Sequence, residues 1–426
     1  GSWESCSIAS MWSRHVLQIA NPRERAAVAA ADAVLRLAVS VRTRRSRPPA
    51  GEVRRILVLR LERIGDLLMS LPALHALRER APQAKIDLVV GSWNEALAKQ
   101  VAGIDSVEVM DARWLARDAG GAGWPALLRQ ARGWRARRYD LAINLEGDVR
   151  SNILLSRAGA RWCAGFGMAG GGPLLDDDVG FDPRSHTAVN GVRLVSAAFG
   201  DTPARATWPV EGREAAARLP RAALTIPAAA HAQADALLSA SAASAPERPL
   251  VGLHVGAGRA VKEWPASRLG DVGAWAVRER GAVVVLTGSS ADRAAAEVLR
   301  RALPDGAVVA DTVGHADLLP LAAVLSRLSL FITPDTGPMP LAAAVGTPIV
   351  ALFGPSSPER WGPLSVQASI VRIDLPCSPC NRIRHPPARC QGHTPDCMHG
   401  IGTSRVIEAA ASLFPPQDRK DGDGPR

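Results

Sequence analysis

Short, continuous apolar runs alternate with segments of helical spacing along most of this chain, and that alternation constrains its fold more than any other feature. The first runs are RRILVLRL (residues 54–61), KIDLVVG (85–91), SVEVMD (106–111) and RYDLAINLEG (138–147). Runs of this kind are typical of strands that are buried on both faces of a sheet. Strands that alternate with helices form βα units, so the fold class is predicted to be α/β with a parallel sheet.

The same alternation begins again after a stretch rich in Ala, Pro and Arg at residues 204–249. A second set of strands is predicted at residues 249–256, 282–290, 307–314, 329–335 and 348–355. A chain of 426 residues is too long for one ordinary hydrophobic core. We therefore expect two Rossmann-like domains with doubly wound sheets, residues 51–246 and 247–426. Ligands are expected in a cleft where the carboxyl ends of the strands face each other.

Residues 1–50 are predicted to form an appendage, with one helix over residues 22–41 followed by the basic linker RTRRSRPPAG. Two interpretations remain open: a solvated helix on a flexible linker, or a basic amphipathic helix that rests on an anionic membrane surface. No apolar run reaches the roughly 18–20 residues that a membrane-spanning helix needs. The other end of the chain is predicted to be a disordered tail.

The formal net charge of +10 favours acidic partners such as nucleotides, phosphates, anionic lipid or nucleic acid. Aromatic residues make up only 4% of the chain, and the paired domains contain no evident stacking platform or basic helix. Both features argue against a nucleic-acid-binding protein. Residues 111–138 are rich in Arg and Trp, and their charge suits a phosphorylated glycolipid.

A polar turn follows the predicted strand at residues 329–335. Asp335, Thr336 and Gly337 lie where the next helix begins, and a helix N-terminus presents free N–H groups and a partial positive charge to an anion. The Thr hydroxyl suits a phosphate, the Asp carboxylate suits sugar hydroxyls, and Gly lets a ligand approach the backbone. The alternative is that Asp335 or Thr336 only caps the helix.

Two more loops follow predicted strands in the same domain. HVGAGRAVKEWP contributes Gly256, Arg259 and Lys262, which suit a diphosphate, although the spacing is not that of a Walker loop. LTGSSADR contributes Ser290 and Asp292, which suit a ribose hydroxyl. We expect the three loops to converge on one nucleotide.

One carboxylate in the N-terminal half is a candidate general base. Asp66 follows Gly65 at the first predicted strand–helix junction, where it would deprotonate an acceptor hydroxyl. The alternative is an N-terminal cap for the helix that starts at Leu67. Arg60 and Arg63 flank it and are predicted to hold acceptor phosphate.

Four segments occur in order between residues 54 and 411: ILVLRLERIGDLLMSLPALHALRERAPQAKIDLVV, DLAINLEGDVRSNILLSRAGARWCAGF, GRAVKEWP and PDTGPMPLAAAVGTPIVALFGPSSPERWGP. Together they resemble glycosyltransferase family nine, the bacterial heptosyltransferases of lipopolysaccharide assembly. The resemblance implies a GT-B architecture, with two Rossmann-like domains that face a cleft. It also implies inverting transfer of heptose from ADP-heptose to a lipopolysaccharide core or related hydroxyl, with no cofactor required for transfer.

The resemblance leaves alternatives open as well. A family member with another donor or acceptor, in O-antigen or protein glycosylation, is one, and a weakly active nucleotide-binding homologue is another. In every case we expect a cytoplasmic protein. In the membrane-surface interpretation of residues 1–50, it is also peripheral at the inner membrane.

The resemblance assigns roles to particular residues. It makes Asp66 the base, Lys262 the contact to donor phosphate, and Asp335, Thr336 and Gly337 the donor-binding motif. Two positions depart from the family pattern, and they are Ser290, where a ribose-binding Glu is usual, and Pro340, where a His is usual. Proline is tolerated in a first helical turn, so the fold should survive. Either Arg259 or another group supplies the lost imidazole contact, or the donor differs, or activity is weak.

Four cysteines cluster near the C-terminus, with the spacing C-x2-C-x9-C-x6-C: Cys377, Cys380, Cys390 and Cys397. Four thiolates suit a tetrahedral structural site for Zn or Fe, and some members of the family carry an iron-binding cysteine motif. We expect such an ion to shape a loop away from the bond being made. The alternative is four reduced or partly bridged cysteines that hold the loop.

Overall fold

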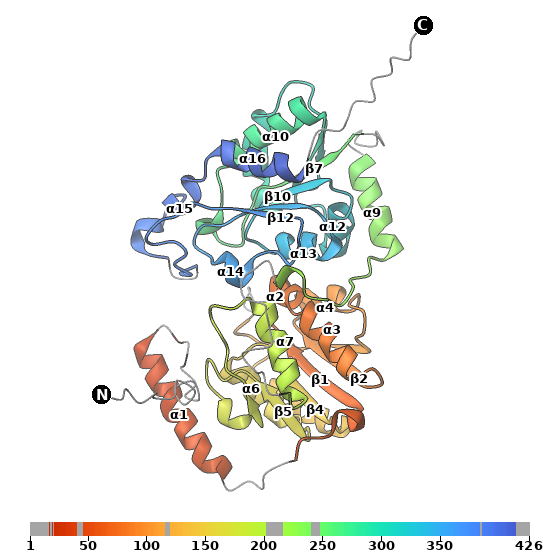
Figure 1. Ribbon diagram of the computed structural model, residues 1–426, viewed down its shortest axis with the longest axis vertical. Coiled ribbons are helices and arrows are strands. Elements are labelled where there is room, and N and C mark those ends of the chain that lie inside the picture. The colour runs from red at the N-terminus through yellow and green to blue at the C-terminus, as the bar shows by residue number, and fades with distance from the viewer. Residues whose placement is uncertain are drawn as a thin grey trace, which may run out of the picture. The chain divides into compact units, whose positions relative to one another are not determined.

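The computed structural model describes residues 17, 19, 21–40, 46–115, 120–201, 216–239, 248–383 and 386–414. The predicted tail, part of the basic linker and the predicted domain junction lie outside these residues. The chain separates into two compact units, Gly1–Glu211 with Leu219–Ala223 and Gly212–Arg218 with Leu224–Arg426. Each unit holds one six-stranded sheet (Figure 1). The predicted α/β class is confirmed.

The sheet of the first unit has the strand order β3-β2-β1-β4-β5-β6, and its strands pair in parallel. The chain moves outward from β1 to β3, returns to the centre, and then moves outward on the other side, which makes the sheet doubly wound. Its strands are β1 (Arg55–Arg60), β2 (Lys85–Val90), β3 (Ser106–Val109), β4 (Leu141–Asn144), β5 (Trp162–Gly165) and β6 (Asp177–Asp178).

The helices of this unit comprise α1, which precedes β1, and those that connect or follow the strands. They are α1 (Pro22–Ser40), α2 (Ile64–Met69), α3 (Leu71–Arg80), α4 (Ser92–Ala98), α5 (Trp124–Gly133), α6 (Val149–Arg157) and α7 (Thr187–Ala198). Helices α3 and α7 lie side by side (Figure 1). A Cβ atom at Gly191 of α7 would lie only 3.2 Å from the Ala73 methyl of α3, so the glycine permits this close contact.

The sheet of the second unit has the order β12-β11-β10-β7-β8-β9, again with parallel pairs. The loops after β7, β8 and β10, which carry the predicted donor-binding residues, therefore leave neighbouring strands at one edge of the sheet. The strands are β7 (Leu250–His254), β8 (Val283–Thr287), β9 (Val309–Asp311), β10 (Leu330–Pro334), β11 (Ile349–Leu352) and β12 (Ala368–Val371).

The helices of the second unit begin with α9, which the predicted boundary at residue 246 places in the first domain. The structure packs α9 against α12, and Asp235 pairs with Arg327 at 2.5 Å. The second unit therefore starts earlier in the chain than the sequence indicates. Its helices are α9 (Ala228–Ser239), α10 (Ala266–Arg280), α11 (Arg293–Arg301), α12 (Leu318–Leu325), α13 (Pro338–Val345), α14 (Pro358–Trp361), α15 (Asp396–His399) and α16 (Thr403–Leu413).

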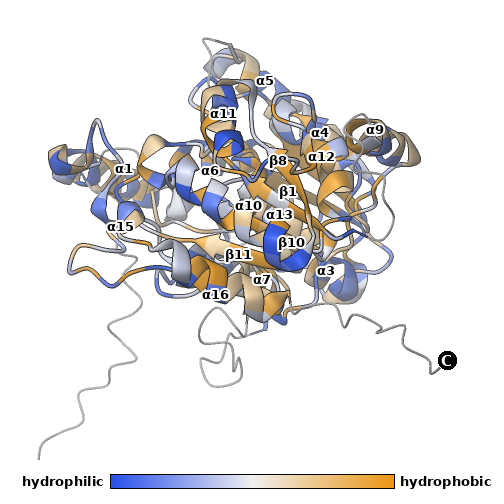
Figure 2. Ribbon diagram, turned by 90° about the horizontal axis from the view of Figure 1, so that it is seen from above, coloured by the Kyte–Doolittle hydropathy of each residue, from blue (hydrophilic) through white to orange (hydrophobic). Residues whose placement is uncertain are grey.

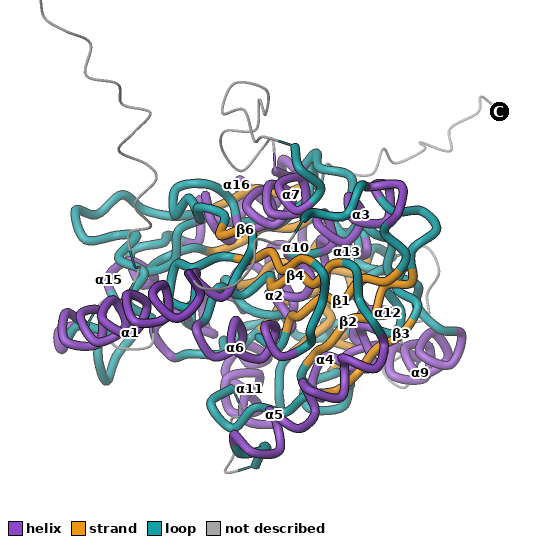
Figure 3. Tube along the Cα trace, turned by 90° about the horizontal axis from the view of Figure 1, so that it is seen from below, coloured by secondary structure: helices purple, strands orange, loops and turns teal. Residues whose placement is uncertain are grey.

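The strands form the centre of each hydrophobic core. Every residue of β8, β10 and β11 is buried, and Figure 2 colours the strands mostly as hydrophobic. In Figure 3 the strands run between helices. This burial on both faces explains why the strands read as continuous apolar runs.

Helix α1 contacts the rest of the first unit through residues 170–174. The buried Asp32 carboxylate accepts the Gly171 N–H at 2.8 Å, and Val28 lies against Gly170. The opposite side of the helix exposes Val34 and Leu37. The predicted helix is confirmed, and no helix in the described parts of the chain is long and apolar enough to cross a bilayer.

Candidate functional site

Asp66 lies in the first turn of α2, directly after the end of β1. One oxygen of its carboxylate accepts the Arg63 N–H at 3.0 Å, so the residue caps the helix, as the alternative interpretation expected. The other oxygen lies 3.7 Å from the Arg60 guanidinium, and 20% of the side chain is exposed. The carboxylate is therefore fixed in place yet open to a ligand.

Arg60 is buried, with only 3% of its side chain exposed. Its guanidinium donates to the Leu145 carbonyl at 2.7 Å, to the Asp66 carbonyl at 3.1 Å and to the Glu62 carboxylate at 2.9 Å. These bonds occupy the guanidinium inside the protein, which disagrees with the prediction that Arg60 holds acceptor phosphate. Arg60 instead organises the loop around Asp66.

Arg63 lies over the Trp93 ring at 5.1 Å. That contact packs the side chain at the β1–α2 junction, where cation–π attraction adds to its placement. Its role toward acceptor phosphate remains a prediction.

Two carboxylates beside Asp66 are not predicted from the sequence. The pKa of Glu62 is raised to about 8, mainly because its carboxyl is desolvated and next because Asp66 lies close. The pKa of Glu146 is raised as well, with burial as the first cause. Glu62 still exposes 35% of its side chain. The sequence feature that could have revealed them is their position: Glu62 follows β1 and Glu146 follows β4, and these two strands are neighbours in the sheet.

Two predicted donor-binding loops meet at Lys262. Its ammonium group lies 2.6 Å from the Asp335 carboxylate and 3.2 Å from the Asp335 carbonyl. The two side chains are 17% and 12% exposed, so the pair is largely shielded from water. Asp335 is further fixed because its N–H donates to the Leu352 carbonyl at 3.1 Å. Residues that are 73 positions apart in the chain thus form one charged centre.

The turn before α13 differs from the expected anion site in one respect. Gly337 is the N-cap residue, and no side chain caps the helix, so the capping alternative for Asp335 and Thr336 is not realised. Pro338 and Pro340 stand in the first turn, where neither has an N–H group. The helix nevertheless forms over Pro338–Val345, as predicted. Fewer N–H donors than usual remain there for an anion.

The loops after β7 and β8 also lie against each other. The Asp292 carboxylate accepts the Ser289 N–H at 2.7 Å and the Ser289 hydroxyl at 2.6 Å. A side chain at Gly256 would collide with that carboxylate, so Gly256 is needed for the approach. Ser290 and Arg259 are exposed at the same edge.

His254, at the end of β7, was missed by sequence reasoning. It is buried, and its Nδ1 lies 2.9 Å from the Thr287 hydroxyl. Burial lowers the pKa of His254 to about 4, so the imidazole is neutral at pH 7. The sequence feature that could have revealed it is a His at the end of a predicted buried strand.

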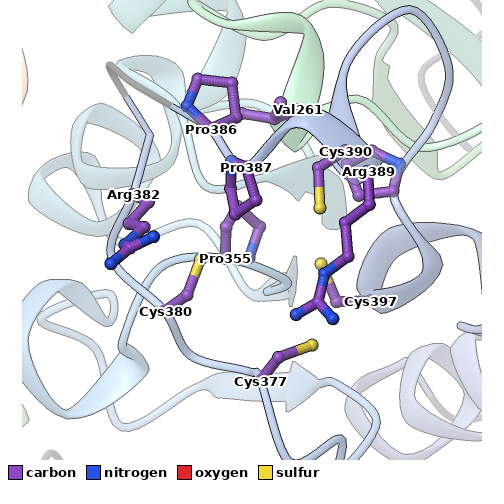
Figure 4. Close-up of a pocket in the computed structure, with 11 residues that line it drawn as sticks. Val261, Pro355, Cys377, Cys380, Arg382, Pro386, Pro387, Arg389, Cys390 and Cys397 are labelled. Atoms are coloured by element: carbon purple, nitrogen blue, oxygen red, sulfur yellow. The ribbon is translucent and has the colours of Figure 1, made fainter.

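The four clustered cysteines line a single cavity of about 30 Å³ (Figure 4). Cys377 is exposed, Cys397 is buried, and all four are free thiols. Burial, and then the neighbouring thiols, raise the pKa of Cys397 to about 11. Among the residues described, no three His, Cys, Asp or Glu side chains are arranged to hold a metal ion. The cavity also includes Val261, one residue before Lys262, so the cluster lies beside the donor loop and not away from it.

Comparison with known proteins identifies the family. The model of glycosyltransferase family 9 (heptosyltransferase) matches residues 127–388. The lipopolysaccharide heptosyltransferase 2 of Salmonella typhimurium is 28% identical over 334 residues, which cover 75% of this chain and 88% of the relative.

Two solved structures share the GT-B fold of two doubly wound parallel sheets. One is the glycosyl transferase family 9 protein from Veillonella parvula, with a TM-score of 0.67, 24% identity, and coverage of 87% of this chain and 99% of the other. The second is E. coli ADP-heptose lps heptosyltransferase II, with a TM-score of 0.65, 24% identity, and coverage of 84% and 98%. Because the family model matches more than half of the 426 residues, this chain is a glycosyltransferase and belongs to glycosyltransferase family 9 (heptosyltransferase).

Proposed function

We propose that this enzyme moves a heptose from ADP-heptose to a hydroxyl of the lipopolysaccharide core or a related phosphorylated glycolipid, with inversion. The observation that carries the proposal is the pair of Lys262 and Asp335, 2.6 Å apart, where two strand-end loops meet. The names of the Salmonella relative and of the E. coli structure support the donor and the acceptor class.

On the donor side, Lys262 would neutralise the diphosphate of ADP-heptose. The ion pair with Asp335 holds the ammonium group in place before the donor arrives, which lowers the entropy that binding must remove. Thr336 and the backbone of Gly337 would contact the phosphates from the other side. Ser290 and Asp292 would face the ribose. Gly256 and Arg259 complete the predicted donor set.

On the acceptor side, Asp66 would act as the general base. Its carboxylate takes the proton of the acceptor hydroxyl, and the oxygen attacks the anomeric carbon from the face opposite ADP. The bond between that carbon and the phosphate oxygen breaks, and ADP leaves with the electron pair. Lys262 stabilises the negative charge that develops on the leaving group.

The direct test is transfer itself. Purified protein is incubated with ADP-heptose and a heptose-deficient lipopolysaccharide core, and the product is measured by mass spectrometry. One added heptose supports the proposal. Other nucleotide sugars are tested in a panel that is ranked by the rise in melting temperature they cause. If only one of those sugars gives a product, the proposed donor is wrong and the family assignment still holds.

We further propose that Cys377, Cys380, Cys390 and Cys397 bind one structural Zn or Fe ion. Their cavity of about 30 Å³ has room for an ion, since a cavity of roughly 10–15 Å³ already holds a water molecule. Binding would require the sulfurs to move inward to ~2.3 Å from the metal, because they are not yet arranged as ligands. Elemental analysis of reduced protein should find one equivalent. A metal content below about a tenth of an equivalent, where stoichiometric filling is expected, would show that the four cysteines are not metal ligands.

We also propose peripheral contact between α1 and the anionic inner membrane, with the enzyme otherwise in the cytoplasm. The helix exposes Val34 and Leu37, at 65% and 74%, and carries Arg23, Arg25 and Arg36. Co-sedimentation with vesicles that contain anionic lipid should exceed that with neutral vesicles. The double variant Val34→Ser/Leu37→Ser should lose the difference, and equal sedimentation of the wild type with both vesicles would contradict the proposal.

A further inference from the structure

The cysteine segment, which we define as residues 375–383 and 386–401, holds the backbone of the loop that follows β11. We call residues 353–357 the β11 loop. The Ser378 hydroxyl donates to the Gly354 carbonyl at 2.7 Å. The Asn381 N–H donates to the Pro355 carbonyl at 2.8 Å, and its side-chain oxygen accepts the Ser357 N–H at 3.1 Å. The cysteine segment thus fixes the β11 loop at three positions within four residues.

A thiol packs directly on this loop. A Cβ atom at Gly354 would lie 3.0 Å from the Cys397 sulfur and 2.5 Å from the Met398 sulfur. Only glycine leaves room for the two sulfur atoms at this point. Cys397 therefore packs against the backbone of the β11 loop at Gly354.

The other wall of the cavity belongs to the loop that follows β7. Val261 lines the cavity together with the four cysteines and Pro355 (Figure 4). The same loop is tied to the cysteine segment because the Trp264 indole donates to the Ile401 carbonyl at 3.1 Å. Arg268 donates to that carbonyl as well, at 2.9 Å. The cavity therefore lies between two loops that leave β7 and β11.

Both loops reach the charged centre of the donor site within a few residues. Lys262 follows Val261 directly, and the Asp335 N–H bonds to Leu352, the residue before the β11 loop. The residue that carries the ammonium group is therefore next to one wall of the thiol cavity, and Asp335 bonds to Leu352, three residues before Pro355 in the other wall. This geometry connects the cavity to the site that would hold the donor diphosphate.

We propose that the thiol cavity and the donor site are coupled, so that a thiophilic divalent cation bound by the four cysteines strengthens binding of the nucleotide diphosphate. Drawing the sulfurs around an ion fixes Cys397 against Gly354 and Val261 beside Lys262. Two loops are then ordered before the donor arrives, which leaves less conformational entropy to lose on binding. Coupling is reciprocal, so bound diphosphate must retain the cation more tightly by the same factor. The diphosphate assignment rests on the proposed function.

The test compares ADP affinity with and without the cation. Reduced, metal-free protein is loaded with one equivalent of Zn²⁺, excess ion is removed by gel filtration, and ADP binding is measured by calorimetry. We expect the loaded protein to bind ADP at least about fivefold more tightly, the lower end of typical coupling. Release of Zn²⁺ to a chromophoric chelator should slow with ADP, after correction for the ADP-bound ion in a protein-free reference.

Two variants separate the coupling from metal binding. Ser378→Ala/Asn381→Gly keeps all four thiols and removes two of the three bonds to the β11 loop. Glycine also accepts the positive φ of 55° at position 381. This variant should still bind one Zn²⁺, but its ADP affinity should depend on the ion less than that of the wild type, because one bond to the β11 loop and the Val261 wall remain. Cys377→Ser should lose the ion, whereas Cys163→Ala, in the other unit, should behave as the wild type.

Each remaining outcome has one meaning. ADP binding that is equal with and without Zn²⁺ in the wild type overturns the coupling alone. A wild type that retains neither Zn²⁺ nor Fe²⁺ overturns it too, together with the metal proposal. If neither the metal-free nor the loaded protein binds ADP but another nucleotide binds, the proposed donor is wrong. The affinities with and without the cation are then compared for that nucleotide.

Discussion

Asp66 shows how one side chain can meet a structural and a chemical demand at once. One carboxylate oxygen caps α2, while 20% of the side chain stays exposed. Asn retains an oxygen that accepts the Arg63 N–H, so Asp66→Asn should keep the fold and ADP affinity. Loss of a general base should lower kcat by roughly 10²–10⁴-fold. Steady-state assays with ADP-heptose measure this, and Glu95→Gln on α4 is the control. Full turnover in Asp66→Asn would remove the residue from the mechanism.

Glu62 gives a pH dependence with a defined sign. Its pKa is about 8 in the folded protein against an ordinary value of 4.5, so the folded state binds this proton more tightly than the unfolded state. The stabilisation is complete below the lower value and is lost as pH rises through about 8. Glu62→Gln removes that loss. The melting temperature of the wild type should therefore fall more than that of Glu62→Gln between pH 6 and pH 9.

Equal losses of melting temperature in the wild type and in Glu62→Gln would show that Glu62 is already charged in the folded protein at pH 6. Asp87→Asn is not a suitable control, because Tyr139 and Arg137 bond to that carboxylate. The Glu95 carboxylate pairs with the exposed Lys99, so Glu95→Gln serves as the control variant instead. Its pH dependence should match the wild type.

The site residues divide into those that local sequence can reveal and those that it cannot. Lys262 and Asp335 follow strands that the apolar runs predict, so their meeting could be expected from a parallel sheet. The role of Arg60 could not, because its shortest hydrogen bond is to the Leu145 carbonyl, 85 residues away. The burial of an arginine depends on acceptors supplied by the tertiary fold.

Among the elements, α13 carries Pro340, at the position where the resemblance leads us to expect a His. Pro340 removes both an N–H group and an imidazole from its first turn. Pro340→Ala restores the N–H alone, and Pro340→His restores both. We expect ADP affinity to rise by roughly tenfold or more with Ala and further with His, since one hydrogen bond to a charged group contributes about 1.5–3 kcal/mol. Calorimetry measures both, and unchanged affinity in the two variants would assign the contact to another group such as Arg259.

Sequence patterns predicted long elements and missed short ones. The strands β1, β2, β7, β8 and β10 all follow from apolar runs, but β5, β6 and β12 were not predicted. Strand β6 is only Asp177–Asp178, too short to show a period of two. Such strands are defined by pairing with a neighbour, here β5. Helix α9 was assigned to the wrong side of the domain boundary because its contact with α12 is not visible in its own sequence.

At the scale of the whole molecule, each unit has its own hydrophobic core. We therefore expect two thermal transitions in calorimetry, and ADP should raise only the one that belongs to the second unit, which holds Lys262. At a hundred times its Kd, a ligand stabilises its domain by about 2.7 kcal/mol. Lys262→Ala should abolish most of the rise, whereas Lys99→Ala should not. A rise of both transitions together would show that the two units unfold as one.

The ion pair of Lys262 and Asp335 has a consequence for turnover. Without donor, the ammonium group already has a counter-ion at 2.6 Å. If Lys262 holds the diphosphate as we propose, the Asp335 carboxylate competes with that diphosphate for the ammonium group both before and after transfer. The ion pair would then speed the release of ADP and, by the same amount, weaken the binding of the donor diphosphate.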